Sequence, residues 1–310
     1  MRTSTNVKLR IAVSVYTAVF VCTAFCILYI LHCTACSPAA KQPEAKTVAP
    51  LCPQRIISTL PSITEILFDI GVGGRIVGVS SFTAYPPEAA AIDKIGGLYD
   101  INHEKILSLK PDIVLYSTEN ESLRQSLTVP GRTLDHRTLQ GVLESYTIIG
   151  ALFGDEVLAA AKNKQAALQN RLNEFAEKAK HRKKLKTLIC IDRSRGTGSI
   201  QNLFVAGKGS FLTDAVQLAG GENAAESVGL LAPVLSAEGV IGLAPEVIID
   251  LGFTPPGAAA ESDLADWQTL GGNVPAVKNK RIYKITDDYA TVPGPRTPLL
   301  IEKLERILHE

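Results

Sequence analysis

The side chains that most often catalyse reactions are few in this chain and form no recognised motif. Its five histidines are widely separated: His32, His103, His136, His181 and His309. No two of them have the spacing of metal ligands on a helix or hairpin, although distant residues can still meet in a fold. The glycine stretches at Gly71, Gly196 and Gly207 lack the further glycines of a dinucleotide loop or a P-loop, and Gly-x-Ser-x-Gly is absent. The sequence therefore predicts no cofactor, no metal and no catalytic nucleophile.

One pattern that contains acidic residues occurs twice. Residues 104–115 (Glu-Lys-Ile-Leu-Ser-Leu-Lys-Pro-Asp-Ile-Val-Leu) match residues 238–249 (Glu-Gly-Val-Ile-Gly-Leu-Ala-Pro-Glu-Val-Ile-Ile) in register. Each copy predicts a short helix that begins with Glu, ends before proline and precedes a buried strand. The aliphatic run of each strand is typical of a parallel sheet that is covered on both faces. Two widely separated copies predict two similar α/β lobes.

Glu104 and Glu238 stand at the start of the two copies and are predicted to face solvent. A carboxylate near a helix N-terminus stabilises that helix through the macrodipole, and this is one explanation for both acids. The other explanation is docking, because a pseudo-symmetric pair of acids suits a partner with two copies of a cationic patch.

The composition is that of a globular protein with one large core or two medium ones. The chain has 310 residues, of which 46% are hydrophobic, and a net charge of +1. This charge, without a basic patch interleaved with aromatic residues, gives no reason to expect a nucleic-acid partner. Cys52 and Cys190 have no metal-ligand spacing, and a disulfide between them remains open.

The N-terminal segment, residues 1–36, differs in kind from the rest. Three basic residues in the first ten precede an apolar run, Ile11–Leu31, that is long enough to span a bilayer. Cys33-Thr-Ala-Cys36 then resembles a lipobox, although leucine is usual where Cys33 stands. Two interpretations follow: a lipoprotein that is lipidated at Cys36 after cleavage, or an uncleaved membrane anchor. Both predict export, to the periplasm or the outer face of the cytoplasmic membrane.

Alternating strand and helix signals follow a Pro-, Ala-, Lys- and Glu-rich tether at residues 37–53. Residues 54–154 predict an N-terminal α/β lobe, in which Ser62 is the expected N-cap of a helix and Glu65 its capping-box partner. Residues 185–310 predict a C-terminal α/β lobe. The segment between them, residues 155–184, carries apolar residues at helical spacing. It predicts one uninterrupted helix of roughly 26 residues, about 40 Å long, that joins the lobes.

Ordered pieces of both predicted lobes resemble a known family. In the first lobe they are Arg55-Ile-Ile-Ser-Thr-Leu-Pro-Ser-Ile-Thr-Glu, Gly78-Val-Ser-Ser, Tyr85-Pro-Pro-Glu-Ala and Asn102-His-Glu-Lys-Ile-Leu. In the second they are Phe204-Val-Ala-Gly-Lys-Gly-Ser-Phe-Leu, Leu218-Ala-Gly-Gly-Glu-Asn and Pro293-Gly-Pro-Arg. Together, over residues 53–308, they resemble the substrate-binding proteins of cobalamin and ferric-siderophore ABC importers. The resemblance implies the class III periplasmic binding protein fold, with two Rossmann-like lobes, parallel-type sheets and one long rigid helix between them.

The resemblance also implies a ligand site between the lobes and a docking role for two acids. The ligand-binding positions are Pro61, Ser62, Phe82, Leu98, Tyr99 and Ser117 in the first lobe, and Phe204, Asp288, Tyr289 and Arg296 in the second. Glu104 and Glu238 correspond to acids that dock onto arginines of the permease dimer, which works with its ATPase subunits. The implied function is capture of a ligand for import, without catalysis.

The ligand class is less defined than the family. The Tyr85-Pro-Pro-Glu-Ala stretch favours a corrinoid, but the tryptophans that cobalamin binders often have near Leu98 and Ser117 are absent. A ferric siderophore is the first alternative, since Arg296, with Arg193 and Arg195, could form a cationic cleft. Haem is the second, since Tyr85, Tyr99 or Tyr289 could coordinate iron. A sensor or adhesin domain, or an enzyme on the same scaffold, is the alternative of another class.

Overall fold

The fold is described from a computed structural model that covers residues 51–98, 100–252 and 262–309. The predicted export segment with Cys36, the tether up to residue 50, and Tyr99 lie outside the described residues. None of the helices in the described ranges combines the length and apolar character that crossing a bilayer requires. Cys52 and Cys190 are both free, the first exposed and the second buried, so the open question of a disulfide is answered in the negative.

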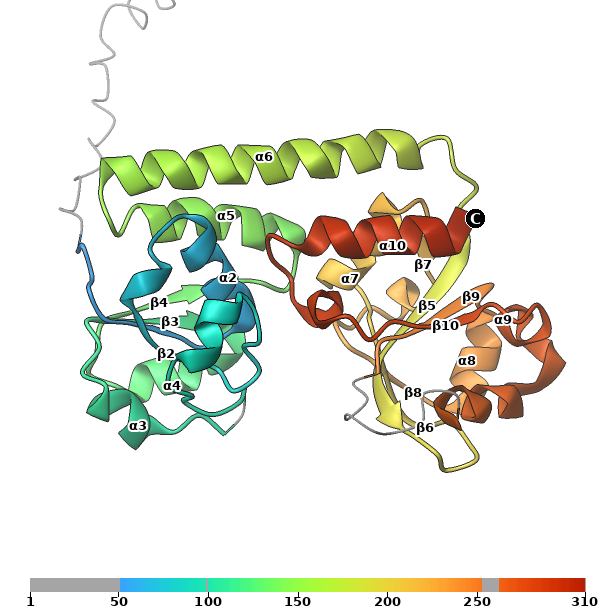
Figure 1. The fold of residues 1–310 in the computed structure, drawn as a ribbon. Coiled ribbons are helices and arrows are strands. Elements are labelled where there is room, and N and C mark those ends of the chain that lie inside the picture. The colour runs from blue at the N-terminus through green and yellow to red at the C-terminus, as the bar shows by residue number, and fades with distance from the viewer. Residues whose placement is uncertain (1–50, 99, 253–261, 310) are drawn as a thin grey trace, which may run out of the picture. The chain divides into compact units, whose positions relative to one another are not determined.

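The first lobe is built on a four-stranded parallel sheet with the order β2-β1-β3-β4 (Figure 1). Its strands are β1 (Ile56–Ser58), β2 (Ile76–Val79), β3 (Ile113–Ser117) and β4 (Gly131–Leu134). Its helices are α2 (Pro61–Asp69), α3 (His103–Ser108), α4 (Glu121–Ser126) and α5 (Leu139–Gly150), with 3-10 turns η1 (Gly73–Arg75), η2 (Pro87–Ala91) and η3 (Thr118–Asn120). Every residue of the central strand β3 is buried, as its aliphatic sequence predicts.

The second lobe is built on a mixed sheet with the order β10-β9-β5-β6-β8, to which β7 adds by pairing with β5. Its strands are β5 (Lys186–Ser194), β6 (Gln201–Val205), β7 (Glu222–Asn223), β8 (Val234–Leu235), β9 (Val247–Asp250) and β10 (Ile282–Lys284). Its helices are α7 (Phe211–Leu218), α8 (Ala237–Leu243), α9 (Pro275–Lys278) and α10 (Thr297–His309), with 3-10 segments η4 (Glu226–Val228), η5 (Ser262–Asn273) and η6 (Asp288–Thr291). The core strands β10, β9, β5 and β7 are parallel, whereas β6 is antiparallel to both of its neighbours, β5 and β8. Gly196 and Gly198, both at positive φ, let the chain reverse between β5 and β6.

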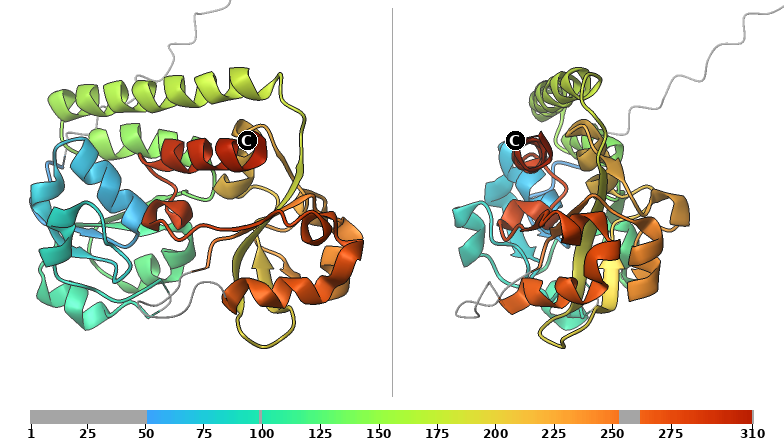
Figure 2. Two further views of the ribbon diagram at one scale, coloured as in Figure 1. Left: turned by 45° about the vertical axis from the view of Figure 1, so that its right-hand side comes forward. Right: turned by 90° about the vertical axis from the view of Figure 1, so that its right-hand side faces the viewer.

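One long helix connects the lobes, as the sequence predicts. Helix α6 (Asp155–Ala179) has 25 residues and lies over α5 of the first lobe and α10 of the second (Figure 1, Figure 2). Ion pairs bind it to both sides: Lys164 to Asp69 of α2 at 2.8 Å, and Arg171 to Glu302 of α10 at 2.6 Å.

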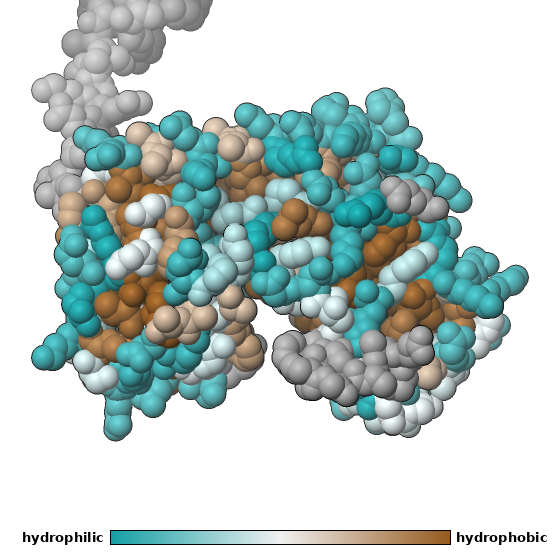
Figure 3. Space-filling model, in the orientation of Figure 1, coloured by the Kyte–Doolittle hydropathy of each residue, from teal (hydrophilic) through white to brown (hydrophobic). Residues whose placement is uncertain are grey.

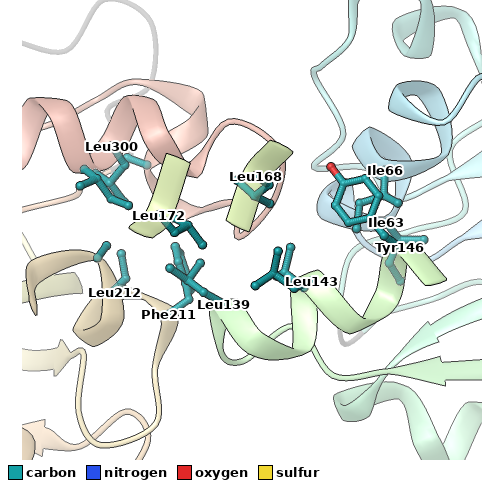
Figure 4. Packing of buried hydrophobic residues seen from close by; sticks show 14 of the residues in the cluster. Ile63, Ile66, Leu139, Leu143, Tyr146, Leu168, Leu172, Phe211, Leu212 and Leu300 are labelled. Atoms are coloured by element: carbon teal, nitrogen blue, oxygen red, sulfur yellow. The ribbon is translucent and has the colours of Figure 1, made fainter. Parts of the chain in front are cut away.

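A single apolar core runs beneath α6 from one lobe to the other. Leu168 and Leu172 of α6 pack between Leu143 of α5 and Leu300 of α10 (Figure 4). Phe211 and Leu212 at the start of α7 extend the same cluster, and Ile63, Ile66 and Tyr146 continue it into the first lobe. Because opening this core would expose close-packed apolar surface, the helical link is stiff and permits only a small change in the angle between the lobes.

The repeated sequence pattern folds in the same way in both lobes. The side chains of Asn102 and Ser236 cap α3 and α8 by accepting hydrogen bonds from backbone N–H groups three residues ahead. Glu104 and Glu238 then occupy the second position of each helix and are exposed.

The helix of each copy ends with the same backbone conformation. Lys110 (φ 48°) and Ala244 (φ 47°) both take the left-handed conformation directly before the proline that ends the helix. The acid after each proline accepts hydrogen bonds from the start of the neighbouring strand: Asp112 from two N–H groups that precede β1, and Glu246 from the N–H of Lys186 in β5.

Candidate ligand-binding site between the lobes

The carboxyl edge of the first sheet carries most of the predicted first-lobe site. Pro61 and Ser62 follow β1, Phe82 follows β2, and Ser117 ends β3. The connections from β1 and β3 run to opposite sides of the sheet, so the carboxyl ends of these two strands flank the crevice where open α/β sheets bind ligands. The surface is hollowed between the two lobes, on the side away from α6 (Figure 3).

Ser62 is a buried member of a hydrogen-bonded chain rather than a helix cap. Helix α2 has Leu60 at its N-cap position and no side-chain cap, so the predicted capping box is wrong. The Ser62 hydroxyl lies 2.6 Å from His136 Nδ1, and His136 Nε2 lies 2.9 Å from Ser145 Oγ. Ser145 donates its own proton to the carbonyl of Gly141. His136 Nε2–H therefore donates to Ser145, and Nδ1 accepts the proton of Ser62.

This chain orients the start of α2 beside the crevice. Burial lowers the pKa of His136 to about 4, against the opposing effect of Asp135, so the imidazole is neutral at physiological pH. Ser62 and His136 form a hydroxyl–imidazole pair that no sequence motif signals, because 74 positions separate them. Both groups are buried, and the second imidazole nitrogen faces a serine rather than a carboxylate, which fits a positioning role.

Leu98 and Ser117 are brought together through a residue that the sequence analysis did not single out. Ser117 Oγ donates to Asn120 Oδ1 at 2.8 Å, and Asn120 Nδ2 donates to the Leu98 carbonyl at 2.9 Å. The backbone N–H of Ser117 donates to Thr59 Oγ1 at 3.2 Å, which joins the ends of β3 and β1. Ser117 is buried, and its bond to Asn120 holds the loop that carries Leu98.

Aromatic side chains are exposed in both lobes. Phe82 is 69% exposed and Phe204, on β6, is 43% exposed, while Tyr85 is also exposed. This exposure rules out core packing, the alternative explanation for both phenylalanines. Large exposed rings provide apolar area and stacking surface for a sizeable, partly planar ligand.

Further apolar residues beside Phe204 were missed from the sequence. Val234 of the edge strand β8 pairs with Phe204, and it is exposed together with Leu230 and Leu231. The carbonyls of Leu230 and Leu231 accept hydrogen bonds from the N–H groups of Lys208 and Gly207, directly after β6. The sequence does carry one sign of these residues, a short apolar run between Gly229 and Pro233 that lacks the alternation of a strand.

Arg296 joins the two lobes by ion pairs. From the segment before α10, its Nη2 lies 2.6 Å from a carboxylate oxygen of Glu65 on α2, while Nη1 lies 2.9 Å from both oxygens of Asp288. Its guanidinium also lies over the ring of Tyr85, 4.0 Å from the ring centroid. One side chain of the second lobe thus contacts two elements of the first lobe, and Glu65 was missed because its capping-box position already explained it.

The positive charge of Arg296 is fully compensated in this cluster. One arginine faces two carboxylates, of which Glu65 is buried and Asp288 is exposed. Burial raises the pKa of Glu65, although the bonds from Arg296 act in the opposite direction. Burial tends to lower the pKa of Arg296, but its bonds to Glu65 and Asp288 raise it, so the guanidinium stays charged.

The two other arginines of the predicted cationic cleft are engaged within the second lobe. Arg193 is buried, with Asp250 at 2.9 Å and Asp266 at 2.8 Å. Arg195 pairs with Asp192 at 2.9 Å and with Asp250 at 3.2 Å. Neither arginine supplies an uncompensated charge for an anionic ligand.

Tyr289 is half-buried against the core, and Arg296 lies 6.0 Å from its ring centroid. Burial and the neighbouring Asp287, which bonds Lys303, raise the pKa of Tyr289. A raised pKa disfavours the phenolate form that a tyrosine uses to bind iron. Within the described ranges, no three His, Cys, Asp or Glu side chains are grouped as a metal site would require.

The fold and the hollow between its lobes define a two-lobed binding protein of the rigid-helix class. The chain belongs to the periplasmic binding protein family, whose family model matches residues 56–289. This match confirms both the resemblance drawn from the sequence and the predicted fold.

Three related proteins show the range of the family. An uncharacterised ABC transporter substrate-binding lipoprotein of Bacillus subtilis, YvrC, is 29% identical over 266 residues, covering 82% of this chain and 79% of that protein. The vitamin B12-binding protein of Vibrio parahaemolyticus is 28% identical over 250 residues, covering 79% and 85%. The solved structure of the periplasmic haem-binding protein RhuT of Roseiflexus has a TM-score of 0.68 at 25% identity, covering 83% and 98%. All three are named as binding proteins.

Proposed function

We propose that this chain is the extracytoplasmic substrate-binding component of an ABC importer, and that it captures a corrinoid between its lobes for delivery to the permease. The observation that carries the choice of ligand is the combination of exposed rings on both lobes with an ion-paired arginine. Phe82 and Phe204 are the proposed stacking residues, and the loops of Pro61–Ser62 and Leu98–Ser117 shape the first-lobe wall. Tyr99 stays a proposed contact.

Charge favours a corrinoid over the siderophore alternative. An anionic iron chelate needs uncompensated cations, whereas Arg193, Arg195 and Arg296 all have carboxylate partners. A corrinoid offers a large, mostly apolar face with amide groups at its rim, which suits rings and neutral polar groups. The relation to several vitamin B12-binding proteins supports the same choice.

Haem is the second candidate, since Tyr85 is an exposed phenol beside Arg296. In the structure the guanidinium of Arg296 covers the ring of Tyr85. Iron coordination by Tyr85 would therefore require Arg296 and its carboxylate partners to rearrange.

The visible absorption spectrum of the protein purified from its native host tests the ligand. Corrinoid, haem and ferric siderophore have different visible bands. Titration of the stripped protein with cyanocobalamin, haemin and a ferric tricatecholate should then give saturable binding with cyanocobalamin alone. Preferred binding of the tricatecholate would refute the charge argument, and a haemin complex that Tyr85→Phe abolishes would establish the haem alternative.

Glu104 and Glu238 are the proposed docking acids for the two halves of a dimeric permease with its ATPase subunits. Their equivalent, exposed positions in the two lobes support this role. Glu104→Arg and Glu238→Arg should each reduce transport and permease binding without changing ligand affinity, and the double variant should be worse. If transport survives both reversals, the acids act only on their own helices.

The N-terminal segment is proposed to export the chain and hold it at the membrane. Cys36 stands where a lipidated cysteine would, and YvrC is named a lipoprotein. Cys36→Ala should abolish lipid labelling and signal-peptide processing. Unchanged processing and attachment in that variant would favour an uncleaved Ile11–Leu31 anchor instead.

A further inference from the structure

Each of the two short helices that begin with a docking acid exposes one large aliphatic side chain at the same motif position. Leu107 on α3 is 49% exposed, and Ile241 on α8 is 37% exposed. Each follows its glutamate, Glu104 or Glu238, by three positions. Residues three apart on a helix are surface neighbours, so each aliphatic group lies beside its acid.

The folding of each lobe does not explain this exposure. The residue before each of these aliphatics, Ile106 in α3 and Val240 in α8, is fully buried and attaches the helix to its own lobe. Leu107 and Ile241 are not members of those core clusters, and leaving part of an aliphatic group in water forgoes the free energy of burying it. Protein–protein interfaces combine an apolar anchor that excludes water with a polar rim. An exposed aliphatic group beside an acid has this combination.

The two acid–aliphatic pairs also share their surroundings. In both copies a side-chain N-cap precedes the acid by two positions, and a left-handed residue followed by proline ends the helix. Neither helix lies against α6 (Figure 1). Two copies of one small surface suit a partner that itself presents two copies of one complementary site.

We propose that Leu107 and Ile241 are apolar anchors of the permease-docking surface, each inserted beside its acid into one half of the permease dimer. This inference rests on the proposed importer function and adds an apolar, salt-independent part to a docking contact otherwise attributed to two charges. The acids orient and accelerate the encounter, and the aliphatic groups slow dissociation by excluding water around the ion pairs.

The test measures binding of cyanocobalamin-loaded protein to its own permease–ATPase complex in lipid nanodiscs. Leu107→Ser and Ile241→Ser should each weaken that binding about tenfold, and the double variant about a hundredfold, mainly through faster dissociation. Cyanocobalamin affinity and the melting temperature should not change. Ile148→Ser is the matched control, because Ile148 on α5 is 42% exposed but lies outside both motifs, and it should bind the permease like the wild type.

Salt separates the two parts of the contact. Raising the NaCl concentration from 50 to 500 mM should weaken binding of the wild type and of Leu107→Ser by the same factor, whereas Glu104→Arg should lose most of that dependence.

Four outcomes would overturn the inference. If the serine variants bind the permease normally while Glu104→Arg does not, the acids dock alone and the proposed importer function stands. If Ile148→Ser weakens binding equally, the effect is not specific to the motifs. If analytical ultracentrifugation shows a dimer of this chain that Leu107→Ser dissociates, the anchors join two copies of the chain. Normal permease binding by all variants, glutamate reversals included, would instead refute docking through these helices altogether.

Discussion

The loops at the carboxyl edges of the two sheets are fixed by different chemistry. In the first lobe two buried hydrogen-bonded networks are neutral, with His136 between Ser62 and Ser145 and Asn120 between Ser117 and Leu98, while Glu65 is a buried carboxylate paired with Arg296 of the second lobe. In the second lobe the corresponding cluster is ionic. Asp250 accepts from Arg193, Arg195 and Trp267, and Asp266 accepts from Arg193 and from the N–H groups of Gly196 and Gly198.

The difference shows how two lobes with the same motif can differ in what holds their loops. The ionic cluster fixes the β5–β6 turn and the segment around Trp267, and it stays charged because its carboxylates keep low pKa values. Burial alone raises the pKa of Asp250, but the bonds from Trp267 and Arg193 hold it below its usual range. The neutral network needs only that His136 remain unprotonated.

The largest expected effect on stability comes from breaking the ionic cluster around Asp250 in the second lobe. Asp250→Ala removes the buried carboxylate that Arg193, Arg195 and Trp267 share, and should lower the free energy of unfolding by about 3–5 kcal/mol. Asp192→Ala is the control, because the Asp192 side chain is 68% exposed, and it should cost less than about 1 kcal/mol. Urea unfolding measures both, and equal losses would show that the second lobe does not depend on its buried charges.

In the first lobe, the buried neutral imidazole of His136 should make the free energy of unfolding depend on pH. Between pH 6.5 and about 4 the unfolded chain protonates His136 while the folded chain does not, so stability falls as the pH falls through this window. A pKa lowered from 6.5 to about 4 corresponds to about 3 kcal/mol.

His136→Gln should therefore be less stable than the wild type at pH 7.5 but lose about 3 kcal/mol less between pH 7.5 and pH 4. Urea unfolding at a series of pH values gives the slope. His181→Gln, in an exposed position after α6, should keep the wild-type slope. Parallel slopes for the wild type and His136→Gln would mean that the folded and unfolded chains protonate His136 over the same pH range, so that folding does not lower its pKa.

The two lobes should contribute comparably to the free energy of ligand binding. Phe82→Ala and Phe204→Ala should each weaken cyanocobalamin binding by about 1–3 kcal/mol, while stability changes by less than about 1 kcal/mol because both rings are exposed. Leu299→Ala, an exposed apolar position on α10, is the control and should leave affinity unchanged. Calorimetric titration that shows a loss for only one phenylalanine would confine the ligand to one lobe.

Much of the fold could be predicted from the sequence because its signals are local. Helical spacing without glycine or proline defines α6, and the aliphatic runs define β3 and β9. The antiparallel strands β6 and β8 were not predicted, since the pairing partner of a short strand is set by distant residues. Ser62 and Glu65 have the spacing of a capping box, yet both side chains make tertiary bonds instead, with His136 and Arg296.

The site could be predicted only in outline, because the resemblance supplies positions but not their contacts. Phe82 and Phe204 are exposed as a stacking role requires, whereas Ser62 and Ser117 are buried and support the loops. Arg296 stays a predicted contact, and its charge is compensated by a glutamate 231 positions away. Such pairing depends on how two lobes meet, which no local pattern encodes.

The smallest expected effect distinguishes the two copies of the repeated motif. Asp112 accepts hydrogen bonds from the N–H groups of Gln54 at 2.7 Å and Arg55 at 2.9 Å, whereas Glu246 accepts one, from Lys186 at 2.9 Å. A net charged hydrogen bond at a partly exposed position contributes about 1 kcal/mol, so Asp112→Ala should cost about 1–2 kcal/mol and Glu246→Ala about half as much.

The matched controls are Asp112→Asn and Glu246→Gln, which keep an acceptor oxygen and should recover part of each loss in urea unfolding. The backbone N–H groups of both acids donate at 2.8 Å to the carbonyls of Arg55 and Lys186, and these substitutions leave the backbone groups in place, so only the side-chain bonds are tested. Equal losses at the two positions would mean that the number of bonds does not set the cost. If neither alanine variant is destabilised, the acid after each proline does not hold the neighbouring strand, and the motif is repeated for its helix and its docking surface alone.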